Sequence, residues 1–217
     1  MGTHGHLVPS PGENAADGHP VVPDAPTGAA FDDELKELVA LLEYRNGIMG
    51  EATTQASTID EYFAGILNFN RYTHPVTTRL VAVCLNAATS SVMQFKFHFQ
   101  RPRPNQVCPA LLPPIDPPQH AAYPSGHATQ SKLLACLMSA IVGPRSTTAH
   151  TAFGTGGSQS RNPYHDMAER IARNREVLGL HYRSDSMAGQ RLAEEIFTRM
   201  QADADFAAEL ALAQAEW

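Results

Sequence analysis

The hydrophobic positions along this chain recur at the spacing of α-helices over most of its length. The first run begins near Phe31 beside an acidic first turn, and its apolar residues repeat three and four positions apart. Asn46-Gly47 is a typical end for that helix. The same spacing predicts helices over 58–70, 75–98, 127–142, 164–178, 182–202 and 203–216. Because no useful stretch alternates as a strand does, the pattern predicts an all-α fold, a single helical bundle.

Two irregular stretches interrupt this pattern. Residues 101–124 carry many prolines, which neither a helix interior nor a central strand accepts, so a long ordered loop is expected there. Residues 143–162 are rich in Gly, Ser and Thr and predict a second loop. We expect both loops to frame a functional site. Residues 1–30 are interpreted as a flexible or surface-wrapped N-terminal tail, which leaves 31–217 as the helical catalytic domain.

Composition narrows the classes of protein to consider. The chain has 217 residues and a formal net charge of −6, which argues against a dedicated nucleic-acid binder. Three scattered cysteines fit neither a disulfide framework nor a zinc site. The N-terminus lacks the features of a secretory signal, and the longest nearly apolar run, Leu133 to Val142, is about half the length that spans a bilayer. We therefore expect no membrane span and a cytoplasmic location, and a homodimer through the first helix is an open alternative.

Two segments carry polar residues suited to binding a tetrahedral anion. Ser125 and Gly126 stand directly before a predicted helix, which places a hydroxyl and free backbone N–H groups at a helix N-terminus, where anions bind. His127 follows in the first turn and reaches the same anion. His181 and Asp185 are four residues apart and therefore share one helical face. There the carboxylate accepts the imidazole Nδ1–H and leaves Nε2 as a nucleophile or ligand.

Three basic residues extend this set. Lys96, Arg103 and Arg175 would supply fixed positive charge suited to a tetrahedral oxyanion. Two histidines and three cations around one anion-binding turn are typical of phosphoryl-type chemistry. Arg101 and Arg183 lie beside the motif residues and are interpreted as surface charges, with an ion pair to Asp185 or a neighbour as the alternative for Arg183.

Three motifs together carry a family resemblance. Lys-x6-Arg-Pro at 96–104, Pro-Ser-Gly-His at 124–127 and Arg-x5-His-x3-Asp at 175–185 resemble the superfamily of type 2 phosphatidic acid phosphatases and vanadium haloperoxidases. The resemblance covers about residues 60–200, with the motifs in order and at ordinary separations. Asn174 departs from it, because the third motif usually has Ser before its Arg. An Asn side chain still donates a hydrogen bond.

The resemblance implies a helical bundle with a shared site for phosphate or vanadate. In this chain His181 would be the nucleophile that becomes phosphohistidine, or the single protein ligand to vanadium, and Asp185 would orient it. His127 would be the acid–base residue that faces it across the oxyanion. The remaining oxygens would be held by Lys96, Arg103, Arg175, Ser125 and the Gly126 N–H. His120, Tyr123 and Asn174 would support or tune the site, although Tyr123 equally suits an anchor for the proline-rich loop.

The surroundings of the site decide between two activities. His120 lies seven residues before His127, as in vanadium bromoperoxidases, whereas soluble acid phosphatases tend to have Asp there. We therefore expect a vanadate-dependent haloperoxidase that oxidises a halide, bromide first, with hydrogen peroxide. The alternative is an acid phosphatase that acts on phosphomonoesters through phosphohistidine and requires no cofactor. A non-catalytic phosphate or vanadate binder is the third interpretation. The chain is far shorter than characterised haloperoxidases and has Met93 where chloroperoxidases place Trp, which counts against the first.

Overall fold

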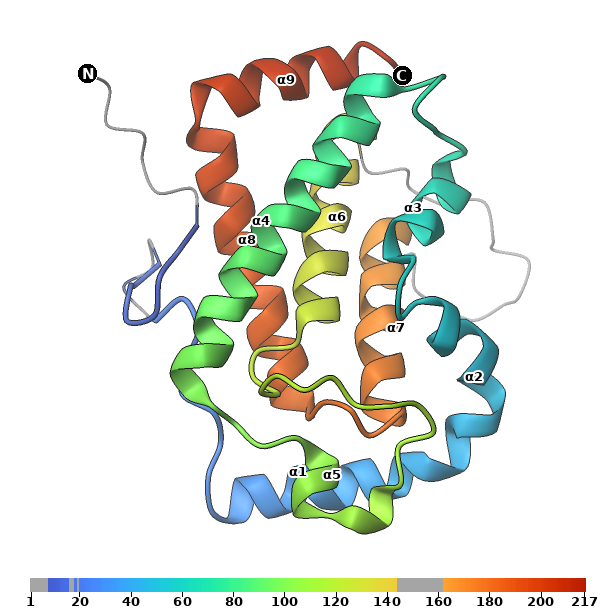
Figure 1. Cartoon of the computed structure of the whole chain (residues 1–217). Helices are drawn as coiled ribbons and strands as arrows, with labels where there is room; N and C mark the ends of the chain where they lie inside the picture. Colours follow the sequence, from blue (N-terminus) through green and yellow to red (C-terminus); the bar gives the residue numbers. More distant parts are fainter. Residues whose placement is uncertain (1–7, 16–17, 19, 144–161) are drawn as a thin grey trace, which may run out of the picture.

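A computed structural model describes residues 8–15, 18, 20–143 and 162–217. In these residues the regular structure is helical, apart from an isolated bridge between Asn14 and Pro20. The all-α prediction is therefore confirmed. The helices, shown in Figure 1, are α1 (Ala29–Ala40), α2 (Arg45–Thr54), α3 (Ile59–Leu67), α4 (Pro75–Phe99), α5 (Pro104–Val107), α6 (Gly126–Val142), α7 (Pro163–Val177), α8 (Arg183–Ala202) and α9 (Ala204–Gln214).

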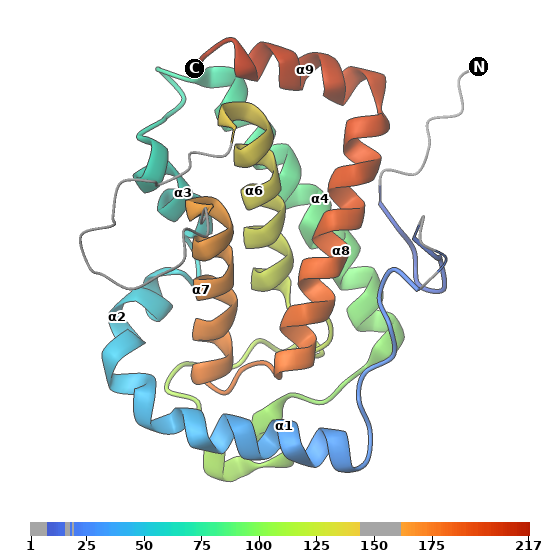
Figure 2. The ribbon, with the colours of Figure 1, turned by 180° about the vertical axis from the view of Figure 1, so that it is seen from behind.

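Helix α6 forms the centre of the bundle. It packs against α4, α7 and α8, while α9 lies across one end of these helices and α1 across the other (Figures 1 and 2). Leu133, Leu134, Leu137 and Met138 of α6 are fully buried. A helix that is apolar on several sides is stable only when neighbours cover it. The end of the bundle near α1 is also where α6 begins, and the site is built at this end.

Capping residues set the starts of the long helices. Pro75 and Pro163 occupy the first turns of α4 and α7, where the missing N–H of proline costs nothing. Ser125 caps α6, and its Oγ accepts a hydrogen bond from the Ala128 N–H at 3.4 Å. These are positions that sequence alone identifies, because the residue types at helix starts are restricted.

The predicted end of the first helix at Asn46-Gly47 is wrong. The chain passes through a 3₁₀ turn at Leu41–Tyr44 and continues as α2 across both residues. The side chain of Arg45 donates from Nε to Val177 O at 2.9 Å and from Nη1 to Leu112 O at 2.9 Å. These long-range contacts fix the start of α2, so the helix-breaking tendency of Gly47 is overridden by tertiary structure.

The first predicted loop is helical in part, whereas the prediction of the second is not tested by the described residues. The proline-rich stretch 101–124 contains the short helix α5 and a 3₁₀ turn at Pro109–Leu111, because Pro104 and Pro109 stand at first positions that tolerate proline. Most of the Gly/Ser-rich stretch lies outside the described residues. Its described neighbours, Val142 and Pro163, lie at the ends of α6 and α7 that are remote from Gly126 and Val177 (Figure 1).

The N-terminal segment contacts the bundle over its described part. Val21 and Val22 are buried in the main hydrophobic core. Pro23 O accepts a hydrogen bond from the Tyr123 hydroxyl at 2.6 Å, and Glu13 forms an ion pair with Arg199 at 2.8 Å. Residues 20–28 are therefore wrapped along the surface rather than free as a flexible tail. The domain boundary near residue 30 stays a prediction.

One described segment meets the length and composition criteria for crossing a membrane. It runs from Pro75 to Val107, has a mean hydropathy of 1.2 in its best window, and is 39% buried within the fold over that window. The search for a membrane span by the longest nearly apolar run did not find this segment, because Thr, Ser and Asn residues lie among its apolar residues. A core helix of a protein in water meets the same criteria, and α4 packs against α6 and α9. The absence of a membrane span stays a prediction.

Helices α6 and α8 approach each other most closely beside the site. A Cβ atom added to Gly189 of α8 would lie 2.6 Å from Ser125 O and 2.9 Å from Thr129 Oγ1. These atoms belong to the first turn of α6 and its cap, which have little freedom to move. Position 189 therefore requires glycine, because the crossing of α6 and α8 leaves no space for a Cβ atom.

We expect Gly189→Ala to lower the free energy of unfolding by about 1–3 kcal/mol, because the new methyl group forces α8 away from α6. Thermal or urea unfolding followed by circular dichroism measures the change. Gly50→Ala is the matched control, since Gly50 lies inside α2 with open space around it. That variant should be at least as stable as the wild type. Equal stability of the Gly189→Ala variant and the wild type would contradict the close approach.

Candidate functional site

The three predicted motif segments meet at the start of α6. Ser125 N–H donates to Asp185 O at 2.9 Å, which joins the second segment to the third. Arg103 Nη1 donates to Leu180 O at 2.9 Å, and Lys96 Nζ donates to Ala121 O at 2.6 Å. Each segment is therefore bonded to another, and the groups far apart in sequence surround one small space.

His181 and Asp185 form the pair that their spacing indicates. His181 Nδ1 lies 3.0 Å from Asp185 Oδ2, and the same oxygen accepts the Tyr182 backbone N–H at 3.0 Å. The other ring nitrogen, Nε2, lies 3.3 Å from Arg103 Nη1. Both side chains are almost completely buried. The carboxylate thus fixes the ring plane and directs Nε2 towards the guanidinium group.

The protonation state of this pair follows from its burial. Burial, and then the charges of Lys96 and Arg103, hold the pKa of His181 well below its usual value, so the ring is neutral at neutral pH. Burial also raises the pKa of Asp185 to about 6, although the neighbouring Arg101 opposes this shift. With Nδ1–H donated to the carboxylate, Nε2 carries a lone pair. His181 is therefore available as a nucleophile or as a ligand.

Lys96, Arg103 and Arg175 are buried, and carbonyl oxygens accept their hydrogen bonds. Lys96 donates to Ala121 O and Ala122 O, Arg103 to His120 O and Leu180 O, and Arg175 to Ala52 O. Within the described part of the chain, none of these three cations has an ion pair with a carboxylate. Asp185 offsets part of the charge of Lys96 and Arg103 through space, and the positive charge that remains favours binding of an anion.

Burial lowers the pKa values of all three cations, and for Lys96 repulsion by Arg103 lowers the pKa further. Burial, followed by the charge of Arg103, lowers the pKa of Lys96 to about 7. Burial lowers the pKa of Arg103 and that of Arg175 to about 10 each. Both guanidinium groups stay charged at neutral pH, whereas Lys96 titrates there. A bound anion would raise all three values, because it stabilises the charged forms.

Two of the buried polar atoms without a hydrogen-bond partner among the described residues belong to the predicted site. His127 Nε2 and Arg175 Nε make no hydrogen bond, although both atoms are shielded from solvent. Burial, and then the charge of Arg175, lowers the pKa of His127 to about 3, so its ring is also neutral. Buried polar atoms are normally satisfied. An oxyanion in this space would supply the missing acceptors.

The start of α6 contributes backbone groups. Ser125 Oγ accepts from the Ala128 N–H, and the Ser125 N–H is bonded to Asp185 O. Gly126 is the first residue of α6, where backbone N–H groups lack acceptors inside the helix. Of the predicted pair, Gly126 supplies the free N–H, and Ser125 acts mainly as the helix cap that holds this turn in place.

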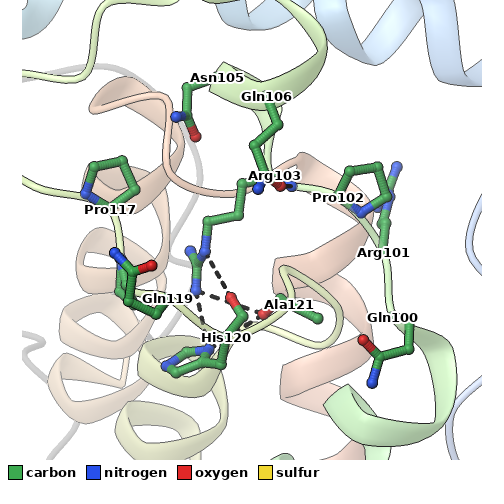
Figure 3. Close-up of a pocket in the computed structure, with 11 residues that line it drawn as sticks. Gln100, Arg101, Pro102, Arg103, Asn105, Gln106, Pro117, Gln119, His120 and Ala121 are labelled. Atoms are coloured by element: carbon green, nitrogen blue, oxygen red, sulfur yellow. Dashed lines mark hydrogen bonds between the residues drawn. The ribbon is translucent and has the colours of Figure 1, made fainter.

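His120 lies at the mouth of the site. Its Nδ1 is 3.1 Å from Arg103 Nη2, and its carbonyl oxygen accepts from Arg103 Nε at 3.0 Å (Figure 3). A cavity of about 370 Å³ opens here, with the side chains of Asn105, Pro117 and Gln119 around the Arg103 guanidinium (Figure 3). His120 is thus in direct contact with a residue of the predicted oxyanion set and also faces the entrance.

The structure places two predicted supporting residues away from the anion space. The Tyr123 hydroxyl donates to Pro23 O, and its ring packs edge-on against Phe99, so Tyr123 anchors the proline-rich loop to the N-terminal segment. Asn174 donates to Gln55 Oε1 at 2.8 Å and to Glu51 Oε1 at 3.2 Å. Its amide therefore ties α7 to α2. The expectation that Tyr123 and Asn174 support or tune the site stays a prediction.

The interpretation of Arg101 as a surface charge is wrong. Its side chain is buried and lies 2.6 Å from Asp185 Oδ1 through Nη1. The Arg-Pro-Arg-Pro sequence at 101–104 could have indicated that Arg101 is buried beside Arg103. Prolines favour an extended backbone, in which residues two apart project to one side. Arg183 does not contact Asp185 but pairs with Glu169 and Glu176.

Comparisons with known proteins agree with this geometry. No family model matches the chain. A vanadium-dependent bromoperoxidase of Ascophyllum nodosum is 30% identical over 122 residues, which cover 44% of this chain and 20% of that protein. The chain thus matches about a fifth of the length of this curated relative. The crystal structure of a transmembrane PAP2-type phosphatidylglycerolphosphate phosphatase from Bacillus subtilis superposes with a TM-score of 0.55 at 16% identity, over 79% of this chain and 84% of that one.

The fold and the site define a helical protein with a buried, positively charged site built around a neutral histidine held by a carboxylate. The fold matches that of the PAP2 phosphatase, and the sequence is similar to that of the bromoperoxidase. The chain is therefore similar to the superfamily of PAP2 phosphatases and vanadium haloperoxidases, in sequence over part of its length and in fold over most of it. This agrees with the resemblance carried by the three motifs.

The titration of Lys96 predicts a pH dependence of anion binding. Sulfate is a suitable probe because its own charge is constant between pH 5 and 9. As the pH rises through about 7, Lys96 in the empty site loses its proton, so we expect the affinity for sulfate to fall. The loss should reach roughly tenfold between pH 6 and pH 8, the order of one charge-assisted hydrogen bond. Isothermal titration calorimetry measures it.

Lys96→Gln should bind sulfate more weakly at pH 6 and show a flatter profile over the same range. The control is Lys132→Gln, because Lys132 pairs with Glu194 away from the site. That variant should retain the wild-type profile. A steep profile in Lys96→Gln would assign the titration to another group.

Proposed function

We propose that this protein is a vanadate-dependent haloperoxidase that oxidises a halide, bromide first, with hydrogen peroxide. The observation that carries the proposal is the neutral His181, whose Nε2 lies 3.3 Å from Nη1 of the buried Arg103, with the buried Lys96 close enough to lower the pKa of the same ring. Two further observations support this reaction in particular. The curated relative is named as a vanadium-dependent bromoperoxidase, and His120 contacts the site at the position where bromoperoxidases resemble this chain.

The residues present fit vanadate. It is a tetrahedral oxyanion, and the unpartnered His127 Nε2 and Arg175 Nε would find acceptors in its oxygens. His181 Nε2 would be the protein ligand, with Lys96 and Arg103 as further partners of the oxygens. When bound, vanadate supplies a Lewis-acidic centre that activates hydrogen peroxide towards two-electron oxidation of the halide.

The side chains of the site have separable tasks in this reaction. Asp185 keeps the proton of His181 on Nδ1, so that Nε2 stays unprotonated and correctly aimed. Arg103 and Arg175 balance the negative charge of the oxyanion. His127 is neutral and buried, and it is placed to exchange a proton with an oxygen of the bound group. The cavity beside His120 is lined mainly by amide, arginine and proline side chains, which suits small hydrophilic substrates such as peroxide and halide.

Purified protein loaded with orthovanadate should brominate a phenolic dye when hydrogen peroxide and bromide are added. The colour change of the dye measures the rate between pH 5 and 8. His181→Ala should lose at least 100-fold of this activity, the order expected when a positioned group is removed from an active site. Lys132→Gln is the control, since it alters a lysine away from the site. No bromination by wild-type protein over this pH range would refute the proposal.

A phosphomonoesterase acting through phosphohistidine is the second candidate. The observation in its favour is the pair of neutral histidines, since His181 Nε2 is unprotonated and His127 lies near enough to lower the pKa of His181. The structural neighbour is itself named a phosphatase. Bound phosphate would raise the pKa of His127 and so favour its protonated form. His181 Nε2 would form a bond to phosphorus as the ester P–O bond breaks, and the leaving alkoxide would take a proton from the His127 imidazolium. Water would then release phosphate from His181.

This candidate predicts phosphate release from p-nitrophenyl phosphate without added metal, inhibition by orthovanadate, and loss of turnover in His181→Ala. Absorbance of p-nitrophenolate measures the rate. Quenching in alkali during turnover, where phosphohistidine is stable, should trap this intermediate in the wild type and none in that variant. If a broad panel of phosphomonoesters releases no phosphate, this candidate is excluded. Tight phosphate binding without either activity would instead indicate a non-catalytic binder.

A further inference from the structure

Arg101 connects Asp185, the hydrogen-bond partner of His181, to Glu34 of α1, which lies outside the three motifs. It lies between α4 and α5 and is 6% exposed. Its Nη1 donates to Asp185 Oδ1 at 2.6 Å, and its Nη2 donates to Glu34 Oε2 at 2.8 Å. Two carboxylates thus share one buried guanidinium group, in the fork geometry that arginine favours.

Glu34 belongs to α1 and fixes the start of α8. Its Oε1 accepts from the Ser184 N–H at 2.6 Å, and its Oε2 accepts from Ser184 Oγ at 2.9 Å. Ser184 directly precedes Asp185 and also accepts from Arg101 Nη1 at 2.7 Å. The N–H groups in the first turn of a helix need such acceptors. One carboxylate from α1 therefore neutralises Arg101 and anchors the turn that carries Asp185.

Aromatic rings keep the Arg101 side chain in this place. The guanidinium carbon lies 3.9 Å from the centroid of the Tyr182 ring and 5.5 Å from that of Phe31. The Phe31 and Tyr182 rings themselves are 5.3 Å apart. A cation that stacks on aromatic faces gains attraction and loses freedom to turn towards solvent. The position of Arg101 is therefore fixed from several sides.

The two oxygens of Asp185 have different partners. Oδ2 accepts from His181 Nδ1 and from the Tyr182 N–H, whereas Oδ1 accepts from Arg101. A carboxylate held through both oxygens has one orientation, and the ring that it holds has one orientation as well. Arg101 differs in this respect from Lys96, Arg103 and Arg175, whose hydrogen bonds go to neutral acceptors, namely carbonyl oxygens and, for Arg103, ring nitrogens of His181 and His120. Its charge is neutralised by ion pairs with two carboxylates, so Arg101 does not contribute charge to an oxyanion site.

We propose that Arg101 is a positioning residue, held by Glu34 of α1, which orients Asp185 and through it the Nε2 atom of His181. The inference rests on the proposed role of His181 as the atom that binds the oxyanion. It makes α1 a necessary part of the site, although Glu34 lies before the region of about 60–200 that resembles the superfamily. Removing Arg101 should weaken oxyanion binding only while Asp185 is present to be oriented.

A double-mutant cycle on the full chain tests this coupling. The probe is orthovanadate, and its affinity is measured from the loss of the free ⁵¹V NMR signal, without any assay of turnover. Arg101→Gln and Asp185→Asn should each weaken binding about tenfold, the order of one hydrogen bond to a charged group. In the double variant, Arg101→Gln should add less than about a twofold further loss. Lys96, His181, Tyr123 and Tyr182 also surround Asp185, so all measurements are made at one pH.

Arg183→Gln is the matched control. Arg183 is the first residue of α8, the helix that contains Asp185. It forms ion pairs with Glu169 and Glu176 but has no bond to Asp185. It should bind orthovanadate within about twofold of the wild type. Circular dichroism establishes that each variant is folded. If Arg101→Gln is not, Arg101→Lys takes its place in the cycle, because a single ammonium group cannot reproduce the fork to both carboxylates.

Equal losses from the Arg101 substitution in the two backgrounds would overturn the proposal, since Arg101 would then act independently of Asp185. A wild-type affinity in folded Arg101→Gln would overturn it as well. Glu34→Gln should weaken binding in the wild type and have little effect in Arg101→Gln. The proposed function fails on a different result, namely wild-type protein that binds orthovanadate and has neither bromination nor phosphatase activity.

Discussion

The site depends on one main-chain contact, the hydrogen bond from Ser125 N–H to Asp185 O at 2.9 Å. It joins the start of α6 to the start of α8, and so brings the anion-binding turn to the histidine and carboxylate of the third motif. The contact is possible because Gly189 leaves room for the two helices to meet. A shift at this crossing would separate Gly126 from His181, and the two motifs would no longer face one anion.

Buried charge is distributed in two ways around this contact. The cations that face the anion space are bonded to carbonyl oxygens, which satisfy their donors without cancelling their charge. Arg101, by contrast, is neutralised by Asp185 and Glu34. A chain with a net charge of −6 therefore holds a local positive site. The cost of burying these charges is high without an anion, and the lowered pKa of Lys96 reflects it.

Much of this protein was predictable from local sequence. Helical spacing and start signals placed the long helices within a few residues, as with Gly126–Val142 and Pro163–Val177. The spacing of His181 and Asp185 also predicted their contact, since residues four apart share a helical face. The end of the first helix was not predictable in this way, because Arg45 holds α2 through carbonyls of residues 112, 177 and 178.

The sequence by itself determined the helical class, the helix starts and the motif residues, because these follow from local spacing and residue chemistry. Only the tertiary structure decided which polar side chains serve the anion space and which serve the fold. Tyr123 and Asn174 turned out to bond to neighbouring segments, and Arg101 proved to be buried against Asp185. The physical reason is that burial and ion pairing are set by contacts between distant segments, which local patterns do not encode.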